Sequence, residues 1–136
     1  MSEENKAIVR RYLEAFNNQT LGVIDEVVAD GFVDHHYPPE LPRGPEGPKL
    51  WWNALYGAFP DGREKIEDVV ADEDKVVVRF TFSGTHQGEF AGIPATGKTF
   101  SISGISIARV ADGKLVEWWE NADALGMMQQ VGVIPS

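Results

Sequence analysis

Three polar residues have the chemical types that acid–base catalysis needs and lie where predicted elements end: Asp123, His86 and His35. His86 has the strand parity of Phe80 and Phe82, so it should share their apolar face, which we take to be the buried one. A polar group on a buried face must be paired or must serve a pocket. The three residues therefore predict a pocket with titratable groups, although a purely structural hydrogen bond remains the alternative for His86.

Asp123 has the parity of four residues along the last predicted strand, Leu115, Glu117, Trp119 and Asn121. A carboxylate with an ordinary pKa of about 3.9 is a poor base for a carbon acid. Burial among Trp and Phe rings would raise that pKa and suit it to proton abstraction. The residues therefore leave two possibilities open, cofactor-free acid–base chemistry by a carboxylate such as Asp123 or plain ligand binding. The alternative is that Asp123 only caps the helix that follows it.

Other chemistries find little support in the sequence. His35 and His36 are neighbours in an extended segment, so they should face opposite ways, and no ligand spacing typical of zinc is present. There is no cysteine and no G-x-S-x-G nucleophile elbow. We expect neither a metal nor another cofactor.

The stretch GIPATGKT, residues 92–99, matches the phosphate-binding pattern G-x-x-x-x-G-K-[ST]. That pattern works only between a buried parallel strand and a helix whose N-terminus faces the phosphates. Here the following residues read as a strand, and Pro94 removes one backbone N–H from the loop. The stretch is therefore predicted to be a connecting loop.

The composition of the chain limits its partners. The 136 residues carry a net charge of -9, which disfavours nucleic acid and anionic membrane surfaces. No apolar run is long enough to span a bilayer, and the N-terminus lacks the layout of a signal peptide. We expect one cytoplasmic domain over residues 1–136.

Helical periodicity marks residues 2–16, 20–30 and 45–59, and period-two patterns follow at 66–71, 76–85, 100–110 and 115–121. A short helical tail ends the chain. Helices followed by an apparent antiparallel meander indicate the α+β class, with the helices packed on one face of a curled sheet. The alternation changes phase near Gly104, where we predict a bulge.

Several blocks together resemble the SnoaL-like polyketide cyclases of the nuclear transport factor 2-like superfamily: FVDHHYPP, AFPD, GTHQGEFAGIPATGK and GKLVEWWENADALGMMQQVG. The resemblance implies a cone-shaped barrel with a deep apolar pocket, a homodimer formed through the outer sheet face, and no cofactor. It also implies that an aspartate, at the position of Asp123, acts as general acid/base for an intramolecular aldol ring closure, and that His86 and His35 look onto the pocket. The Arg-x-Asp spacing of the related epoxide hydrolases is missing.

These arguments lead to an enzyme that closes a ring in a small apolar carbonyl compound, with a non-catalytic small-molecule-binding module as the alternative. The expected substrate-binding residues are Tyr12, Phe16, Trp51, Leu55, Phe80, Phe82, Glu117, Trp119 and Asn121.

Overall fold

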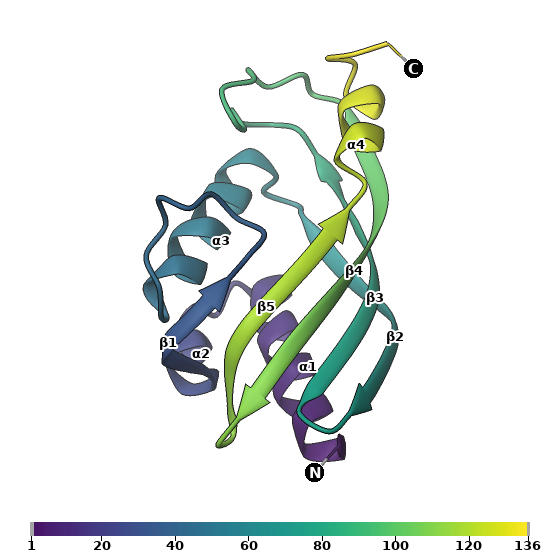
Figure 1. Cartoon of the computed structure of the whole chain (residues 1–136). Helices are drawn as coiled ribbons and strands as arrows, with labels where there is room; N and C mark the ends of the chain where they lie inside the picture. The colour runs from purple at the N-terminus through teal and green to yellow at the C-terminus, as the bar shows by residue number, and fades with distance from the viewer. Residues whose placement is uncertain (1, 136) are drawn as a thin grey trace.

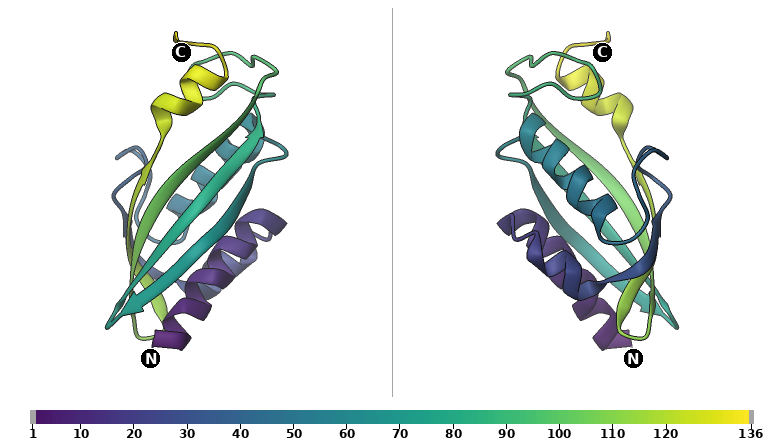
Figure 2. Two further views of the ribbon diagram at one scale, coloured as in Figure 1. Left: turned by 90° about the vertical axis from the view of Figure 1, so that its right-hand side faces the viewer. Right: turned by 90° about the vertical axis from the view of Figure 1, so that its left-hand side faces the viewer.

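The first three helices lie on one face of a five-stranded sheet (Figures 1 and 2). The computed structural model describes residues 2–135. Its elements are α1 (Ser2–Asn18), α2 (Gly22–Val27), β1 (Val28–Asp34), α3 (Glu46–Ala58), β2 (Arg63–Asp72), β3 (Lys75–Thr85), β4 (Thr99–Ala111), β5 (Lys114–Ala122) and α4 (Ala124–Gln130). The predicted α+β class is confirmed, and the sheet is curved and cone-like but not closed into a barrel.

Helix α1 packs on the sheet because its apolar residues recur every three or four positions. Val9, Tyr12, Leu13 and Phe16 are all buried, while polar residues occupy the opposite side. They form the main core together with side chains from α2 and the inner face of the sheet. No helix within residues 2–135 combines the length and apolar character that a bilayer-spanning segment needs.

The sheet has the strand order β1-β5-β4-β3-β2, and β1 runs parallel to β5. The predicted antiparallel meander is confirmed for β2 to β5, whereas the parallel strand β1 at its edge was not predicted. The predicted second helix is also too long, because the chain leaves it at Val27 and enters β1 at Val28. Local helical spacing did not reveal that these β-branched residues would pair with a strand near the C-terminus.

Strand β4 alternates strictly between buried and exposed residues around Gly104, so the bulge predicted there is absent. Its pairing with β3 runs without interruption from Lys75↔Arg109 to Thr85↔Thr99. Ile105 and Ile107 simply face outward, where they are 50% and 36% exposed. The apparent phase change came from treating every isoleucine as a core residue.

Gly104 has a packing role. It pairs with Phe80 on β3, and a Cβ atom on Gly104 would lie only 2.3 Å from the Phe80 ring. The missing side chain therefore leaves room for the Phe80 ring over the inner face of the sheet.

The irregularity in this part of the sheet lies in β5. Val110 pairs with Leu115 and Arg109 pairs with Glu117, which leaves Val116 as an extra, unpaired residue. Such a bulge reverses the inward and outward order of all later side chains in the strand. After Val116 the inward residues are therefore Trp118 and Glu120.

The stretch at residues 92–99 is a connecting loop that leads directly into β4, as predicted. Gly92 and Gly97 have positive φ angles, which explains two of the glycines in the phosphate-binding pattern. The base of the loop is closed by two backbone bonds, from His86 N–H to the Lys98 carbonyl and from Gly97 N–H to the His86 carbonyl.

We predict that Gly104→Ala destabilises the protein by about 1–3 kcal/mol, because the new methyl group must displace the Phe80 ring. Urea denaturation with a fluorescence readout measures this loss. Gly57→Ala is the matched control, since a Cβ atom added to Gly57 in α3 would have no atom within 4 Å and alanine favours helix. Equal stability of the Gly104→Ala variant and the wild type would show that Phe80 does not require the glycine.

Candidate functional site

A cavity of about 380 Å³ lies between α1, α3 and the inner face of the sheet, within the size range of small-molecule sites. Its wall is largely aromatic and aliphatic, with a few titratable groups. The lining residues are Tyr12, Leu13, Phe16, Asp34, His36, Tyr37, Trp51, Trp52, Leu55, Glu64, Phe80, Phe82, Phe90, Ile102, Trp118, Glu120, Asn121, Ala122, Ala124 and Met127.

His36 lies between two carboxylates on the cavity wall. Its Nδ1 is 3.2 Å from Asp34 Oδ1, and its Nε2 is 3.3 Å from Glu120 Oε2. The same Asp34 oxygen also accepts the backbone N–H of His36 at 2.9 Å. Because Asp34 ends β1 and Glu120 lies on β5, the parallel pairing of these strands creates the cluster.

Glu120 is held in place by donors from two strands. Its Oε1 accepts hydrogen bonds from Ser106 Oγ at 2.9 Å and from Trp118 Nε1 at 3.2 Å. Ser106 is almost fully buried on β4, where its hydroxyl would lack a partner on this apolar face without the carboxylate. Glu120 is therefore oriented with its other oxygen toward His36.

The pKa of His36 is raised above its ordinary value. Burial opposes protonation, but the hydrogen bond to Asp34 and the negative charges of Glu120 and Asp34 outweigh it. The imidazole is thus favoured as a cation, which can donate a proton inside the cavity. Within residues 2–135 no three potential ligand side chains are arranged to hold a metal ion.

Glu64 is a cavity carboxyl whose pKa is raised. It lies near the start of β2, and Asn17 fixes its backbone by accepting from Glu64 N–H and donating to the Glu64 carbonyl, both at 2.8 Å. Burial, together with the negative charge of Glu120, raises the pKa of the Glu64 carboxyl to about 8. A carboxyl with this pKa is a much stronger base than an exposed one once it ionises.

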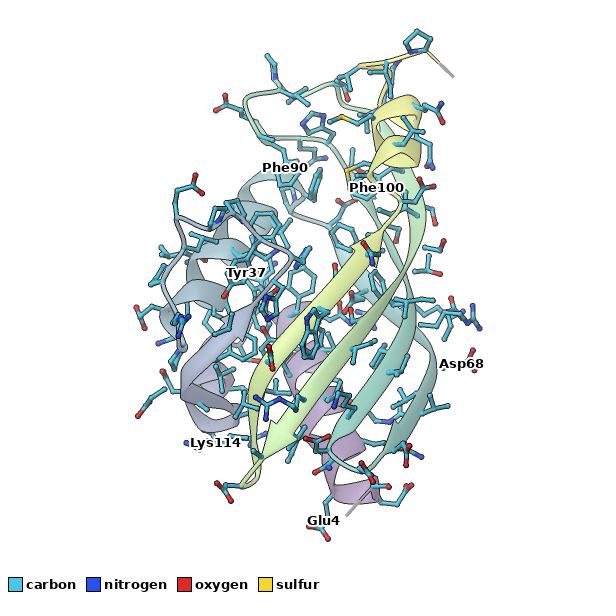
Figure 3. The ribbon with its side chains drawn as sticks, viewed as in Figure 1. Glu4, Tyr37, Asp68, Phe90, Phe100 and Lys114 are labelled. Carbon is cyan, nitrogen blue, oxygen red and sulfur yellow. The ribbon has the colours of Figure 1, made fainter. Side chains whose placement is uncertain are left out.

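Aromatic rings from three segments surround the part of the cavity near α3. Trp51 on α3 has its ring centre 6.0 Å from that of Tyr37 and 6.1 Å from that of Phe90. Tyr37 follows β1 and Phe90 lies in the loop between β3 and β4, and Figure 3 labels both beside α3. Flat apolar walls of this kind suit a planar, conjugated ligand.

Asp123 does not lie in the cavity, so its predicted placement is wrong. Its side chain is exposed and accepts the backbone N–H of Gly126 at 2.8 Å, as the N-cap of α4. The parity that linked it with Leu115 breaks at the extra residue Val116. The alternative interpretation of Asp123, a helix cap, agrees with this geometry.

The same bulge turns Glu117 and Trp119 to the outer face, so neither lines the cavity as predicted. His35 is there too. Its Nε2 is 2.7 Å from Glu117 Oε2, and its ring stacks on Trp119 at 5.2 Å. The expectation that His35 and His36 face opposite ways is confirmed, but His36 is the one that faces the cavity.

His86 is buried on the predicted face but lies outside the cavity lining. Its Nδ1 is 3.2 Å from Thr96 Oγ1, and its ring packs against Phe59 with a centroid distance of 5.8 Å. It therefore lies beneath the loop that joins β3 to β4. The pocket position expected for His86 is wrong because the strand carries it past the end of the cavity.

The other predicted binding residues line the cavity: Tyr12, Phe16, Trp51, Leu55, Phe80, Phe82 and Asn121. Four titratable residues were missed, namely Asp34, His36, Glu64 and Glu120. Asp34 and His36 were visible in the block FVDHHYPP, but choosing between His35 and His36 required the pairing of β1. Glu64 had one usable signal, since it lies two residues before Ile66, where the predicted strand 66–71 begins, and has the same strand parity.

Comparison with known proteins identifies this architecture. The sequence profile of the family described as SnoaL-like polyketide cyclase matches residues 6–131. The chain belongs to the SnoaL-like polyketide cyclase family.

Two relatives of this SnoaL-like chain are aklanonic acid methyl ester cyclases. DauD from Streptomyces sp. strain C5 is 33% identical over 132 residues, covering 92% of this chain and 80% of DauD. DnrD from Streptomyces peucetius is also 33% identical over 132 residues, covering 92% of this chain and 88% of DnrD.

Solved structures agree with the family assignment. TsrD from Streptomyces laurentii superposes with a TM-score of 0.89 at 29% identity, covering 97% of each chain. IdmH from Streptomyces antibioticus gives a TM-score of 0.81 at 33% identity, covering 94% of this chain and 98% of IdmH. The SnoaL-like fold is therefore common to this chain and to both of these proteins.

We predict that Glu64 makes this SnoaL-like protein less stable as the pH rises. The folded state binds the Glu64 proton more tightly than the unfolded state, whose carboxyl titrates near 4.5, so stability falls between about pH 5 and pH 8 and then levels off for this group. Glu64→Gln removes this contribution, whose slope is at most about 1.4 kcal/mol per pH unit. Urea denaturation at a series of pH values compares the two proteins.

The exposed Glu14 on α1 supplies the control variant Glu14→Gln, which should keep the wild-type pH dependence. A Glu64→Gln profile parallel to that of the wild type would show that the Glu64 carboxyl titrates like an exposed one.

Proposed function

We propose that this chain catalyses an intramolecular aldol ring closure on a small polyketide-like carbonyl compound, with Glu64 as the general base. The observation that carries the proposal is a half-buried carboxyl of raised pKa on the wall of an aromatic cavity, whose lining also includes a histidine held between two carboxylates. Membership of the cyclase family and the similarity to the aklanonic acid methyl ester cyclases DauD and DnrD support the reaction type.

The ring closure uses these residues in two steps. Ionised Glu64 removes a proton from a carbon flanked by carbonyl groups, which leaves an enolate. The enolate carbon attacks a second carbonyl of the same molecule, forming the new carbon–carbon bond. His36, favoured as a cation by Asp34 and Glu120, gives a proton to the resulting alkoxide, and the proton on Glu64 then restores His36 through the cavity or solvent.

The charges around the cavity favour an uncharged substrate. Asp34, Glu64 and Glu120 all line it, while the described lining residues include no lysine or arginine. A free carboxylate would be repelled by these groups and would find no fixed cation apart from His36, which is already paired. An ester, such as the methyl ester in the names of DauD and DnrD, avoids this cost.

A non-catalytic binding module is the less favoured interpretation. Carriage of an apolar ligand needs an apolar cavity, but it does not need a carboxyl of raised pKa beside an oriented histidine. Exchange of the acidic C–H of a bound β-dicarbonyl ester for deuterium in heavy water would separate the two, because a binding module leaves that proton in place.

We predict that Glu64→Gln lowers turnover of an aromatic polyketide methyl ester by about 10²–10⁴-fold, the usual contribution of a general base. Ionisation of Glu64 should raise the wild-type rate as the pH increases toward about 8, and loss of the His36 proton should lower the rate. Steady-state kinetics over this pH range measure both limbs.

Asp123→Asn is the informative comparison, because the family resemblance gives the acid/base role to Asp123 whereas the geometry favours Glu64. The Asn side chain keeps a capping oxygen, so this variant should remain folded and active. Full activity in Glu64→Gln combined with loss of activity in Asp123→Asn would reject our assignment and return the role to Asp123.

We also propose that two copies of the chain associate through the outer face of the sheet. Ile105 and Ile107 lie exposed there next to Trp119, and they border a hollow in the same face. Apolar side chains grouped on one sheet face favour burial against a partner surface. The dimers implied by the family resemblance use this face.

We predict that Ile105→Glu converts a wild-type dimer into a monomer, because a charge would be buried at the contact. Multi-angle light scattering measures the mass of each protein in solution. Leu125→Glu is the control, since Leu125 is 62% exposed and belongs to α4, not to a strand of the sheet. A wild-type protein with the mass of one chain would contradict the dimer.

A further inference from the structure

We propose that Tyr12 is a catalytic residue of the cavity, whose hydroxyl donates a hydrogen bond to the carbonyl oxygen on which negative charge develops. The inference rests on the proposed function for its catalytic part. The hydrogen bond from the phenol to a carbonyl oxygen can be tested without turnover.

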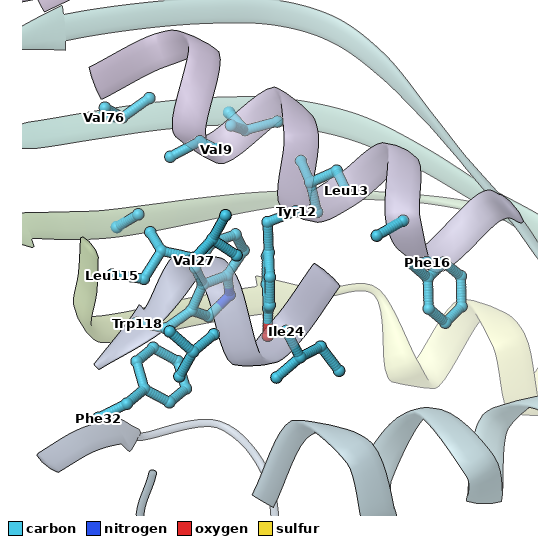
Figure 4. Close-up of a cluster of buried hydrophobic side chains, with 14 of the residues drawn as sticks. Val9, Tyr12, Leu13, Phe16, Ile24, Val27, Phe32, Val76, Leu115 and Trp118 are labelled. Atoms are coloured by element: carbon cyan, nitrogen blue, oxygen red, sulfur yellow. The ribbon is translucent and has the colours of Figure 1, made fainter. Parts of the chain in front are cut away.

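Tyr12 is fixed in position by its ring. The side chain comes from the middle of α1 and is 4% exposed. Its ring centre is 4.9 Å from that of Trp52 and 5.2 Å from that of Trp118. Figure 4 shows the ring extending from α1 beside Trp118, with the hydroxyl at its far end. The packing therefore orients the phenol before any ligand enters.

The hydroxyl itself has no hydrogen-bond partner among the described residues. Within residues 2–135, the fully sealed side-chain atoms without a partner are the Tyr37 hydroxyl and His86 Nε2. The Tyr12 oxygen is not one of them although Tyr12 lines the cavity, so it opens into the cavity. A deeply buried donor without an acceptor is costly unless a ligand supplies one.

The surroundings of the hydroxyl keep it protonated. Burial raises the pKa of Tyr12 well above its ordinary value, and the nearby charges of Asp34, Glu120 and Glu64 add to the effect. The phenol is therefore a neutral donor at every pH at which Glu64 titrates. It also lies within electrostatic reach of each carboxyl in the cavity, which places it near the reacting atoms.

A donor in this position favours the enolate over the ketone. Its hydrogen bond strengthens as charge moves onto the oxygen, so it lowers the barrier more than it tightens substrate binding. The cavity otherwise offers mainly carboxylates, which would repel an oxyanion. Tyr12 therefore supplies the neutral stabilisation that Glu64 and Glu120 cannot give.

Tyr12→Phe removes the hydroxyl and keeps the ring packing. We expect kcat for an aromatic polyketide methyl ester to fall about 100-fold, the usual effect of losing one oxyanion donor, with little change in KM. The rise in rate toward about pH 8 should persist, because Glu64 remains. A variant whose fold is merely disturbed would instead lose thermal stability and binding together.

The test independent of turnover is the infrared carbonyl stretch of bound 2-acetylnaphthalene, labelled with carbon-13 at the carbonyl. The stretch should lie at lower frequency in the wild type than in Tyr12→Phe, because a hydrogen bond weakens the carbonyl bond. Tyr56→Phe is the matched control, since the Tyr56 hydroxyl donates to the Phe16 carbonyl at 2.7 Å and does not line the cavity. It should show the wild-type frequency.

Identical carbonyl stretching frequencies in the wild type and in Tyr12→Phe would overturn the inference, whatever the turnover of the two proteins. A shifted stretch in a wild-type protein that closes no ring would instead remove the proposed function and leave Tyr12 as the carbonyl-binding donor of the cavity.

Discussion

The extra residue in β5 decides which side chains reach the cavity. Without the bulge at Val116, Glu117 and Trp119 would point inward, and Glu120 would face outward. With it, Glu120 and Trp118 lie on the inner face, where Ser106 and the Trp118 indole bind the Glu120 carboxylate. The place of Glu120 in the titratable cluster depends on this one change of phase.

The carboxyl groups of the cavity differ in how their surroundings offset the cost of burying a negative charge. Asp34 and Glu120 have His36 between them, and Glu120 also accepts a hydrogen bond from Ser106. Glu64 has no such cation beside it among the described lining residues, so burial and repulsion from Glu120 keep its proton on to higher pH. The same cavity thus contains a proton donor, His36, and a strong base, Glu64.

Local patterns predicted the elements that local interactions determine. The apolar stripe of α1, the alternation along β3 and the connecting role of residues 92–99 all follow from spacing and turn chemistry. The aromatic wall of the cavity was also predictable, because large apolar residues on inner faces must gather there. A carboxyl of raised pKa is present in the cavity wall, but it belongs to Glu64 and not to Asp123.

Long-range pairing explains what could not be predicted. The choice between His35 and His36 depends on how β1 pairs with β5, and the inward position of Glu120 depends on an unpaired residue that no composition rule marks. Both facts arise from contacts between distant parts of the chain. Asp123, to which the family resemblance gave the acid/base role, is a helix cap in this structure.

The parallel pairing of β1 with β5 also affects how the protein folds during synthesis on the ribosome. His35 and Glu117, which are joined across these strands, are 82 positions apart in the chain. Until β5 has been synthesised, β1 has a bare edge with no strand to pair with, and Asp34 and His36 have no opposing carboxylate. Closing so long a loop is entropically costly, so assembly of this edge should be a late and cooperative step. The nascent chain therefore carries an unpaired, aggregation-prone strand until β5 has been synthesised.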